Sequence, residues 1–138
     1  MDAKVTWAGG MTFDGAADSG FQVKMDTSVE SGGSNSGVRP MELVLIALGG
    51  CTSMDVVPIL KKKRQEVNAF EIRIHGDRAE EHPHVYTHIT LEYVVTGHNI
   101  DQAAVERAIE LSETKYCSVM AMLRKSTELT TRYTIIEG

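Results

Sequence analysis

Apolar and polar residues alternate in several short stretches at the start of the chain, a pattern typical of strands. Residues 3–8 form the first stretch, and Gly9-Gly10 indicates a turn after it. Residues 11–14 are expected to return as a second strand, and the alternation at residues 21–25 predicts a third. We therefore expect a small antiparallel meander at the N-terminus.

A long apolar segment follows a Gly- and Ser-rich stretch at residues 31–37, which we interpret as a mobile loop. Proline is well tolerated in the first helical turn, so Pro40 is expected to open a helix. Apolar residues continue to Leu60, and the basic run at 61–64 suits a helix C-terminus because cations complement the helix dipole. Pro58 is expected to kink this helix or restart it.

The predicted helix is apolar on nearly every side, which is typical of a helix surrounded by protein. A chain of 138 residues can bury one core, so we expect a single domain spanning 1–138. Complete enclosure of such a helix in so small a domain requires a partner subunit. The pattern therefore predicts a homodimer.

The second half of the chain alternates strands and helices. Residues 70–74 and 85–95 predict two strands of a hairpin, joined by a turn at 80–83. A helix should begin near Gln102 with Asn99 or Asp101 as its cap, a second helical piece should cover 118–125, and residues 129–135 should form a closing strand. This order predicts an α+β fold with its helices on one side of antiparallel sheet.

The charge and the apolar content exclude several classes of protein. A net charge of −5 argues against nucleic-acid binding, which needs a basic face to neutralise phosphates. The first residues contain no apolar leader, and the longest uninterrupted apolar run, Leu43 to Leu48, is too short to span a bilayer. We therefore expect no membrane partner and a cytoplasmic location, where thiols are mostly kept reduced.

Two cysteines are the strongest candidates for chemistry. Cys51 and Cys117 lie 66 positions apart, so they do not form the close pairs of a zinc finger or ribbon. They could form one disulfide, or act as a reactive thiol and its resolving partner. Each could equally be a small buried core residue, because free cysteine is among the most buried residue types.

The neighbours of each cysteine favour a functional interpretation. Glycines at 49 and 50 precede Cys51 despite their cost in a helix, which indicates a close approach of another backbone or room for a ligand beside the thiol. The hydroxyls of Thr52 and Ser53 could hydrogen-bond a thiolate or a peroxide oxygen. Cys117 should begin a helical piece whose unpaired N–H groups favour its thiolate, and Tyr116 and Met120 should supply apolar surface beside it.

Histidines form a second candidate cluster. His82, His84 and His88 fall on one predicted strand face, which would in principle allow zinc binding. The surrounding tract is rich in charge and is expected to face solvent, so we expect no resident metal. The chain also lacks the Gly-x-Ser-x-Gly motif of serine hydrolases and a phosphate-binding glycine loop after a strand.

The Pro40–Met54 segment with Cys51 and the Tyr116–Val119 segment with Cys117 resemble the family of osmotically inducible protein C and organic hydroperoxide resistance protein. The resemblance covers nearly the whole chain. It implies an OsmC-like fold, an intertwined homodimer with the long helices at its interface, and a role in oxidative-stress defence. It also implies that Cys51 attacks an organic hydroperoxide, that Cys117 resolves the product as a disulfide, and that an external dithiol, rather than a bound cofactor, reduces this disulfide.

The chain departs from the family pattern at the groups that activate the thiol. Family peroxidases pair an arginine of the early hairpin with a glutamate directly after the helix-opening proline; Met11 and Met41 stand at these positions. Glu42 comes one residue later, which rotates its side chain by about 100°, and it precedes Cys51 by about 13 Å of helix. Arg39 is the nearest candidate replacement cation. The alternative function is therefore a dimer that binds a small apolar ligand with little or no catalysis, with Met11, Met41, Tyr116 and Met120 as candidate pocket residues.

Overall fold

A computed structural model describes all residues from 1 to 138. The chain divides into two compact units, Met1–Val44 and Leu45–Gly138, and each is described by itself. The long helix α1 (Pro40–Lys62) begins in the first unit and continues through the second.

The first unit contains the expected meander. Strands β1 (Ala3–Trp7), β2 (Phe13–Ala17) and β3 (Gln22–Met25) pair antiparallel in the order β1-β2-β3. The first turn is wider than the sequence indicated: it covers residues 8–12, where the Ala8 N–H donates to the Thr12 carbonyl and the Trp7 indole donates to the Gly10 carbonyl. The pairing register places an apolar set on one face: Val5, Trp7, Phe13, Val23 and Met25.

The loop between β3 and α1 is organised around a buried carboxylate, so the expectation of a mobile loop is replaced by a defined structure. Asp26 is 3% exposed and accepts hydrogen bonds from the Ser36 hydroxyl at 2.6 Å and from the backbone N–H groups of Thr27, Ser34 and Ser36. These bonds, the Ser36 hydroxyl first, hold the pKa of Asp26 well below its usual range. The charged carboxylate therefore fixes the chain that leads into α1.

Helix α1 is a single continuous element. It runs through Pro58 without restarting, so the restart that the sequence suggested does not occur. Its N-terminus is closed by the Glu42 carboxylate, which accepts the Arg39 backbone N–H at 2.8 Å, as in one half of a capping box. Lys61 and Lys62 lie in its last turn, as expected for the helix dipole.

The length of α1 revises one inference from the sequence. The helix has 23 residues and contains an 18-residue stretch with a mean hydropathy of 2.0, so it is long and apolar enough to cross a membrane by length and composition alone. The sequence argument counted only the uninterrupted run from Leu43 to Leu48 and therefore underestimated the helix. Core helices of soluble proteins meet the same two criteria, so length and composition do not decide its surroundings.

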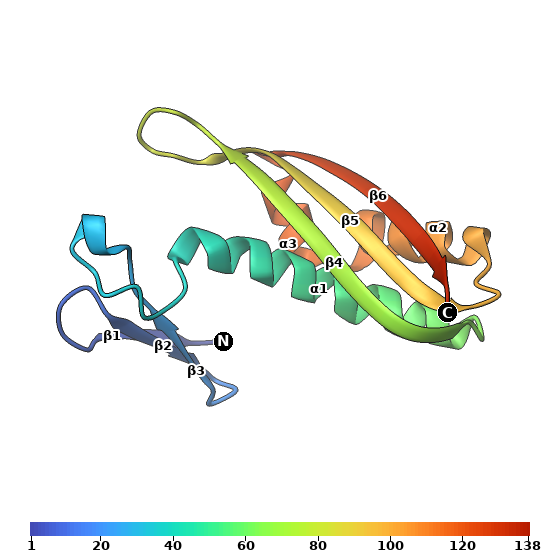
Figure 1. The fold of residues 1–138 in the computed structure, drawn as a ribbon, viewed down its shortest axis with the longest axis horizontal. Coiled ribbons are helices and arrows are strands. Elements are labelled where there is room, and N and C mark those ends of the chain that lie inside the picture. The colour runs from blue at the N-terminus through green and yellow to red at the C-terminus, as the bar shows by residue number, and fades with distance from the viewer. The chain divides into compact units, whose positions relative to one another are not determined.

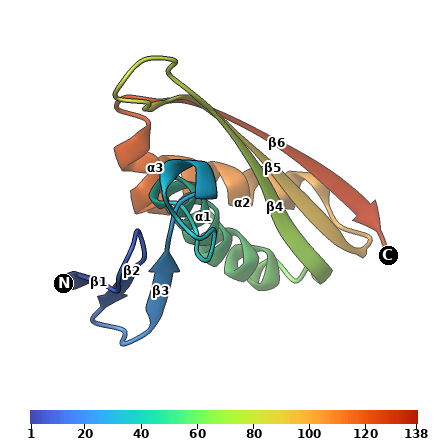
Figure 2. The same cartoon turned by 60° about the vertical axis from the view of Figure 1, so that its left-hand side comes forward.

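The second unit is a three-stranded sheet with helices against one face (Figure 1). Its strands β4 (Glu66–Arg78), β5 (Tyr86–His98) and β6 (Glu128–Glu137) pair in the order β4-β5-β6. Helix α2 (Gln102–Leu111), the π-helical turn η2 (Ser112–Tyr116) and helix α3 (Ser118–Leu123) connect β5 to β6. Figures 1 and 2 show α1, α2 and α3 on the same side of this sheet, as the sequence predicted.

One feature of the sheet contradicts the prediction of purely antiparallel pairing. The β4–β5 hairpin is antiparallel, but β5 and β6 are parallel from His88↔Glu128 to Gly97↔Glu137. The helical crossover carries the chain back to the end of the sheet where β5 began, and a strand that starts there must run beside β5 in the same direction. The α+β class is therefore confirmed, with a mixed sheet.

The core lies between β5 and the helices. Ile89, Leu91, Tyr93 and Val95 alternate on the buried face of β5, as the sequence pattern indicated. They are joined by fully buried side chains from the helices: Leu48, Val56, Leu60, Val105, Ala108 and Met120. Of the two candidate caps of α2, Asn99 and Asp101, the structure uses Asp101, whose carboxylate accepts the Ala103 N–H at 3.1 Å.

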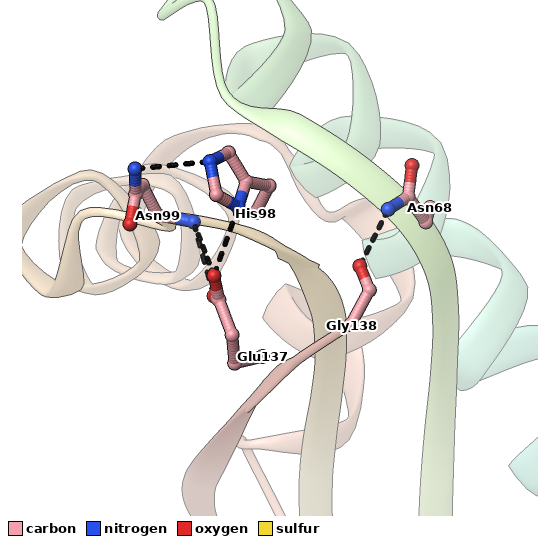
Figure 3. A network of polar contacts seen from close by, with 5 residues as sticks. All are labelled: Asn68, His98, Asn99, Glu137 and Gly138. Carbon is pink, nitrogen blue, oxygen red and sulfur yellow. Dashed lines mark hydrogen bonds and ion pairs between the residues drawn. The ribbon is translucent and has the colours of Figure 1, made fainter.

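The C-terminus is fastened to the sheet by a polar cluster (Figure 3). The Glu137 carboxylate accepts the Asn99 backbone N–H and contacts the His98 ring at 2.9 Å, and the Asn68 amide donates to the Gly138 carbonyl at 2.7 Å. The Gly138 N–H donates to the Gly97 carbonyl at 3.1 Å. The end of β6 is therefore held to both of the other strands.

Candidate thiol site

The two cysteines, distant in sequence, lie together in the second unit. Cys51 projects from the middle of α1, and its side chain is in hydrogen-bond contact with Cys117 at the start of α3. Both are free thiols; Cys51 is half-buried, whereas Cys117 is 3% exposed. The structure thus provides a contacting thiol pair with one member more accessible than the other.

Cys117 is the N-cap of α3, as the sequence suggested. Its Sγ accepts the Met120 backbone N–H at 3.4 Å. This bond lowers the pKa of the thiol, but burial has the larger effect and raises the pKa of Cys117 to about 11, with a further increase from the contact with Cys51. Cys117 is therefore held as a thiol rather than the expected thiolate.

The hydroxyls beside Cys51 have different partners from those predicted. Ser53 donates back to the Gly49 carbonyl of its own helix at 2.6 Å. Thr52 is fully buried and bonds the Tyr93 hydroxyl at 2.8 Å and the Ser112 hydroxyl at 2.7 Å. Ser112 in turn donates to the Asp55 carboxylate at 2.8 Å. Thr52 therefore belongs to a buried polar chain and Ser53 bonds its own helix, so neither hydroxyl is bonded to the thiol.

The two glycines before Cys51 have separate roles. A Cβ on Gly49 would lie 2.6 Å from the Ile74 side chain, so this glycine lets α1 pack closely on β4. A Cβ on Gly50 would meet nothing within 4 Å. The group packed against Gly49 is therefore a side chain rather than the predicted backbone, and open space lies at Gly50.

The candidate supporting residues Arg39 and Glu42 both have structural partners in the first unit. The Arg39 guanidinium donates to the Gly37 carbonyl at 2.9 Å and to the Asn35 side chain at 2.7 Å. The Glu42 carboxylate caps α1 through the Arg39 backbone. These contacts stabilise the entry to the helix.

The candidate pocket residues divide into two groups. Met11 and Met41 belong to the first unit, where Met11 is exposed in the β1–β2 turn and Met41 is half-buried in the first turn of α1. Met120 is fully buried beside Cys117, whereas Tyr116 is half exposed with the Lys115 ammonium 5.3 Å from its ring centre. Of the two predicted neighbours of Cys117, Met120 supplies the buried apolar surface.

The three histidines have separate surroundings. The His82 and His84 rings are 4.0 Å apart, and His84 contacts the Ala79 carbonyl at 2.9 Å. His88 contacts the Thr130 hydroxyl on β6 at 2.7 Å. No three residues of the types His, Cys, Asp and Glu are gathered as metal ligands.

Three polar residues near the thiols were missed by the sequence interpretation: Tyr93, Ser112 and Asp55. Tyr93 sits on the buried face of β5, where burial raises its pKa to about 12. The signal for Tyr93 was a hydroxyl-bearing side chain on an otherwise apolar strand face. The signal for Asp55 was its position three residues after Thr52, which places both polar side chains on one face of an apolar helix. Ser112 carried no signal, because its burial depends on the π-helical turn.

This arrangement defines an α+β protein in which a long central helix presents one thiol to another at the start of a short helix. The model of the OsmC-like protein family matches residues 33–132. Protein YhfA of Escherichia coli strain K12 is 45% identical over 139 aligned residues, covering 99% of this chain and 98% of that protein. The chain therefore belongs to the OsmC-like protein family, which confirms the resemblance.

Solved structures agree with this assignment. A hypothetical protein from Aquifex aeolicus VF5 is 35% identical, with a TM-score of 0.87 over 99% of this chain and 96% of that chain. An organic hydroperoxide resistance protein from Legionella pneumophila, also described as a predicted redox protein, has a TM-score of 0.72 over 96% and 95% of the two chains. The latter is 12% identical and supports the fold alone.

Proposed function

We propose that this protein reduces organic hydroperoxides with its cysteine pair and thereby contributes to oxidative-stress defence. The observation that carries the proposal is the contact between the half-buried Cys51 and the buried Cys117 across two elements far apart in sequence. Membership of the OsmC-like family, whose fold is shared with the organic hydroperoxide resistance protein from Legionella pneumophila, supports it.

The proposed reaction has three steps. The Cys51 thiolate attacks the distal oxygen of the hydroperoxide, the O–O bond breaks, and the alkoxide leaves as an alcohol after taking a proton, which leaves a sulfenic acid on Cys51. The Cys117 sulfur displaces the hydroxyl of this sulfenic acid, which forms a disulfide and releases water. A dithiol then reduces the disulfide by exchange and is itself oxidised.

The surroundings of the two thiols support this order of roles. An attacking thiol must meet a substrate from outside, which suits the more accessible Cys51. Cys117 is buried, and its pKa is raised to about 11, so it is a poor first nucleophile but is already in contact with the sulfur that it would resolve. We propose as part of the same function that the protein works in the cytoplasm and that a dithiol reduces its disulfide. Disulfides in that compartment are usually transient and catalytic, which agrees with a disulfide that forms and is reduced in each cycle.

One observation favours the alternative of a ligand-binding dimer. The Arg39 guanidinium and the Glu42 carboxylate bind the loop and the backbone at the entry to α1, so neither is held as a replacement for the family's activating pair. An attacking thiol with no cation beside it lacks this source of activation and reacts slowly with a peroxide. Under this alternative the protein binds a small apolar molecule without turnover.

The disulfide provides the direct test. One equivalent of cumene hydroperoxide should convert the reduced protein to a species lighter by about 2 Da, from the two hydrogens lost on disulfide formation. Intact-mass and peptide mass spectrometry should assign the bond to Cys51 and Cys117. Protein that keeps both thiols free while the peroxide persists would exclude the peroxidase function.

We also propose that the protein is a homodimer joined through α1. Ile46, Gly50, Met54 and Val57 follow one another along a single face of the helix, and Met54 is 80% exposed in the isolated chain. Open space at Gly50 would allow a second helix to approach closely. A second copy suits this face better than lipid does, because Asp55 on the same helix is bonded to Ser112 of the folded unit.

Sedimentation equilibrium should therefore give twice the 15.1 kDa mass of the chain. Met54→Asp places a charge on the exposed apolar face and should convert the dimer to a monomer, since an unpaired charge is costly to bury. Thr114→Asp, on the exposed side of η2, is the matched control and should remain dimeric. A wild-type protein that sediments as a monomer at micromolar concentration would contradict the proposal.

A further inference from the structure

The buried polar chain beside the cysteines has a fixed direction. Each hydroxyl has a single hydrogen to donate, and the Asp55 carboxylate only accepts. Ser112 uses its hydrogen on Asp55, so Thr52 must donate to Ser112, and Tyr93 must donate to Thr52. Thr52 and Ser112 each accept one hydrogen bond and donate one, while Tyr93 only donates and Asp55 only accepts, which favours a single arrangement of the groups.

The chain joins the two segments that carry the thiols. Thr52 directly follows Cys51 on α1, and Asp55 lies one turn further along the same helix. Both bind the hydroxyl of Ser112, the first residue of η2. Ser112 also accepts the Cys117 backbone N–H on its carbonyl oxygen at 2.9 Å. One residue therefore contacts the neighbour of Cys51 through its side chain and Cys117 itself through its backbone.

Because these groups are buried, the hydrogen bonds between them are costly to break. Thr52, Ser112 and Tyr93 are all 0% exposed, and no buried side-chain polar atom lacks a partner. Loss of one hydroxyl would leave its partner buried without a hydrogen bond, which costs more than the bond itself contributed. A shift of α1 relative to η2 carries the same penalty, so the polar chain resists the motion that would separate the two sulfurs.

We propose that the Thr52–Ser112 hydrogen bond is a positioning device that holds α1 against η2 and thereby keeps Cys51 within disulfide-forming reach of Cys117. Thr52 and Ser112 are positioning residues: they act on the thiols through the backbone and touch no substrate. The inference rests on the proposed redox use of the pair and adds to it the feature that sets how readily the disulfide closes.

The test is the equilibrium between the dithiol and disulfide forms of the full chain in mixtures of reduced and oxidised dithiothreitol. Thr52→Val keeps the shape of the side chain but removes the hydroxyl, and we expect it to lower the equilibrium constant for disulfide formation about tenfold, or about 30 mV in potential. Thr52→Ser keeps the hydroxyl and should restore the wild-type value. Alkylation followed by mass spectrometry measures the disulfide fraction.

Two control variants separate positioning from general damage. Ser53→Ala removes a hydroxyl that bonds only the Gly49 carbonyl of its own helix, and Leu60→Val trims a buried side chain of α1 outside the polar chain. Both should keep the wild-type equilibrium constant, even where the melting temperature falls. An equal loss in the controls and in Thr52→Val would overturn the inference, as would a wild-type value in Thr52→Val.

A second variant tests the same hydrogen bond in case Thr52→Val does not fold. Ser112→Ala removes the hydroxyl from the other side of the bond and should lower the equilibrium constant in the same direction, and a wild-type value there would equally overturn the inference. The measurement uses no hydroperoxide. A wild-type protein that forms the disulfide but consumes no hydroperoxide would therefore refute the proposed function and leave the positioning role standing.

Discussion

Replacement of Cys51 by serine is expected to abolish the disulfide and to lower the consumption of cumene hydroperoxide by about 10³-fold or more. Serine is nearly the same size as cysteine, but its hydroxyl does not ionise near neutral pH and is a poor nucleophile toward peroxide oxygen. Cys51 is half-buried, and its side chain forms a hydrogen bond with Cys117, so a serine of similar size should leave the fold intact. A coupled assay with excess dithiothreitol measures the loss.

Cys117→Ser is the matched control for this prediction. It should retain the first attack and lose only the resolving step, so that Cys51 is oxidised further to the sulfinic acid, a gain of about 32 Da for two added oxygens. Equal hydroperoxide consumption by wild type and Cys51→Ser would remove Cys51 from the reaction. A rise in melting temperature with an apolar ligand, unchanged in Cys51→Ser, would then favour the ligand-binding alternative.

Replacement of Gly97 by alanine is expected to lower the free energy of unfolding by about 3 kcal/mol. A Cβ at this position would lie 2.0 Å from the Glu66 carbonyl oxygen and 2.7 Å from the Ile100 side chain. The first contact is with backbone in the paired strand β4, which cannot move aside without breaking the ladder near its bulge at Val67. Urea denaturation followed by circular dichroism gives the change.

Thr96→Ala provides the comparison for Gly97→Ala. Thr96 precedes Gly97 on β5 and points to the opposite face of the sheet, so its truncation should cost less than about 1 kcal/mol. The Gly97 carbonyl also accepts the N–H of Gly138, the residue that follows β6. Gly97→Ala with wild-type stability would show that β4 can give way at this point.

The elements of this fold were predictable where one face of a segment is buried. Alternation identified β5, and the proline at 40 with the basic run at 61–64 bounded α1. The parallel pairing of β6 was not predictable, because the pattern within a strand carries no information on the direction of its neighbour. That direction depends on the length and course of the crossover through α2, η2 and α3.

The pair of thiols in the candidate site was predictable, but the residues that support it were not. Cys51 and Cys117 could be selected because they are the only cysteines of the chain and glycines and hydroxyls flank Cys51, and the family resemblance pointed to their association. Thr52 was noticed, but its partners were not, because a hydroxyl on a helix gives no sign of which distant side chain it meets. Glu42 was read as a possible aid to catalysis, whereas its spacing of three from Arg39 already fitted a helix cap.

The π-helical turn η2 makes the length of one surface segment matter more than its composition. The bond from the Cys117 N–H to the Ser112 carbonyl spans five residues, one more than in an α-helix. Thr114, Lys115 and Tyr116 within this span are exposed, so packing in the core does not constrain their side chains. The loss of a single residue there would turn the chain by about 100° and carry Cys117 out of phase with Cys51. Homologues that use both thiols should therefore vary in the amino-acid sequence of this segment but keep its length constant.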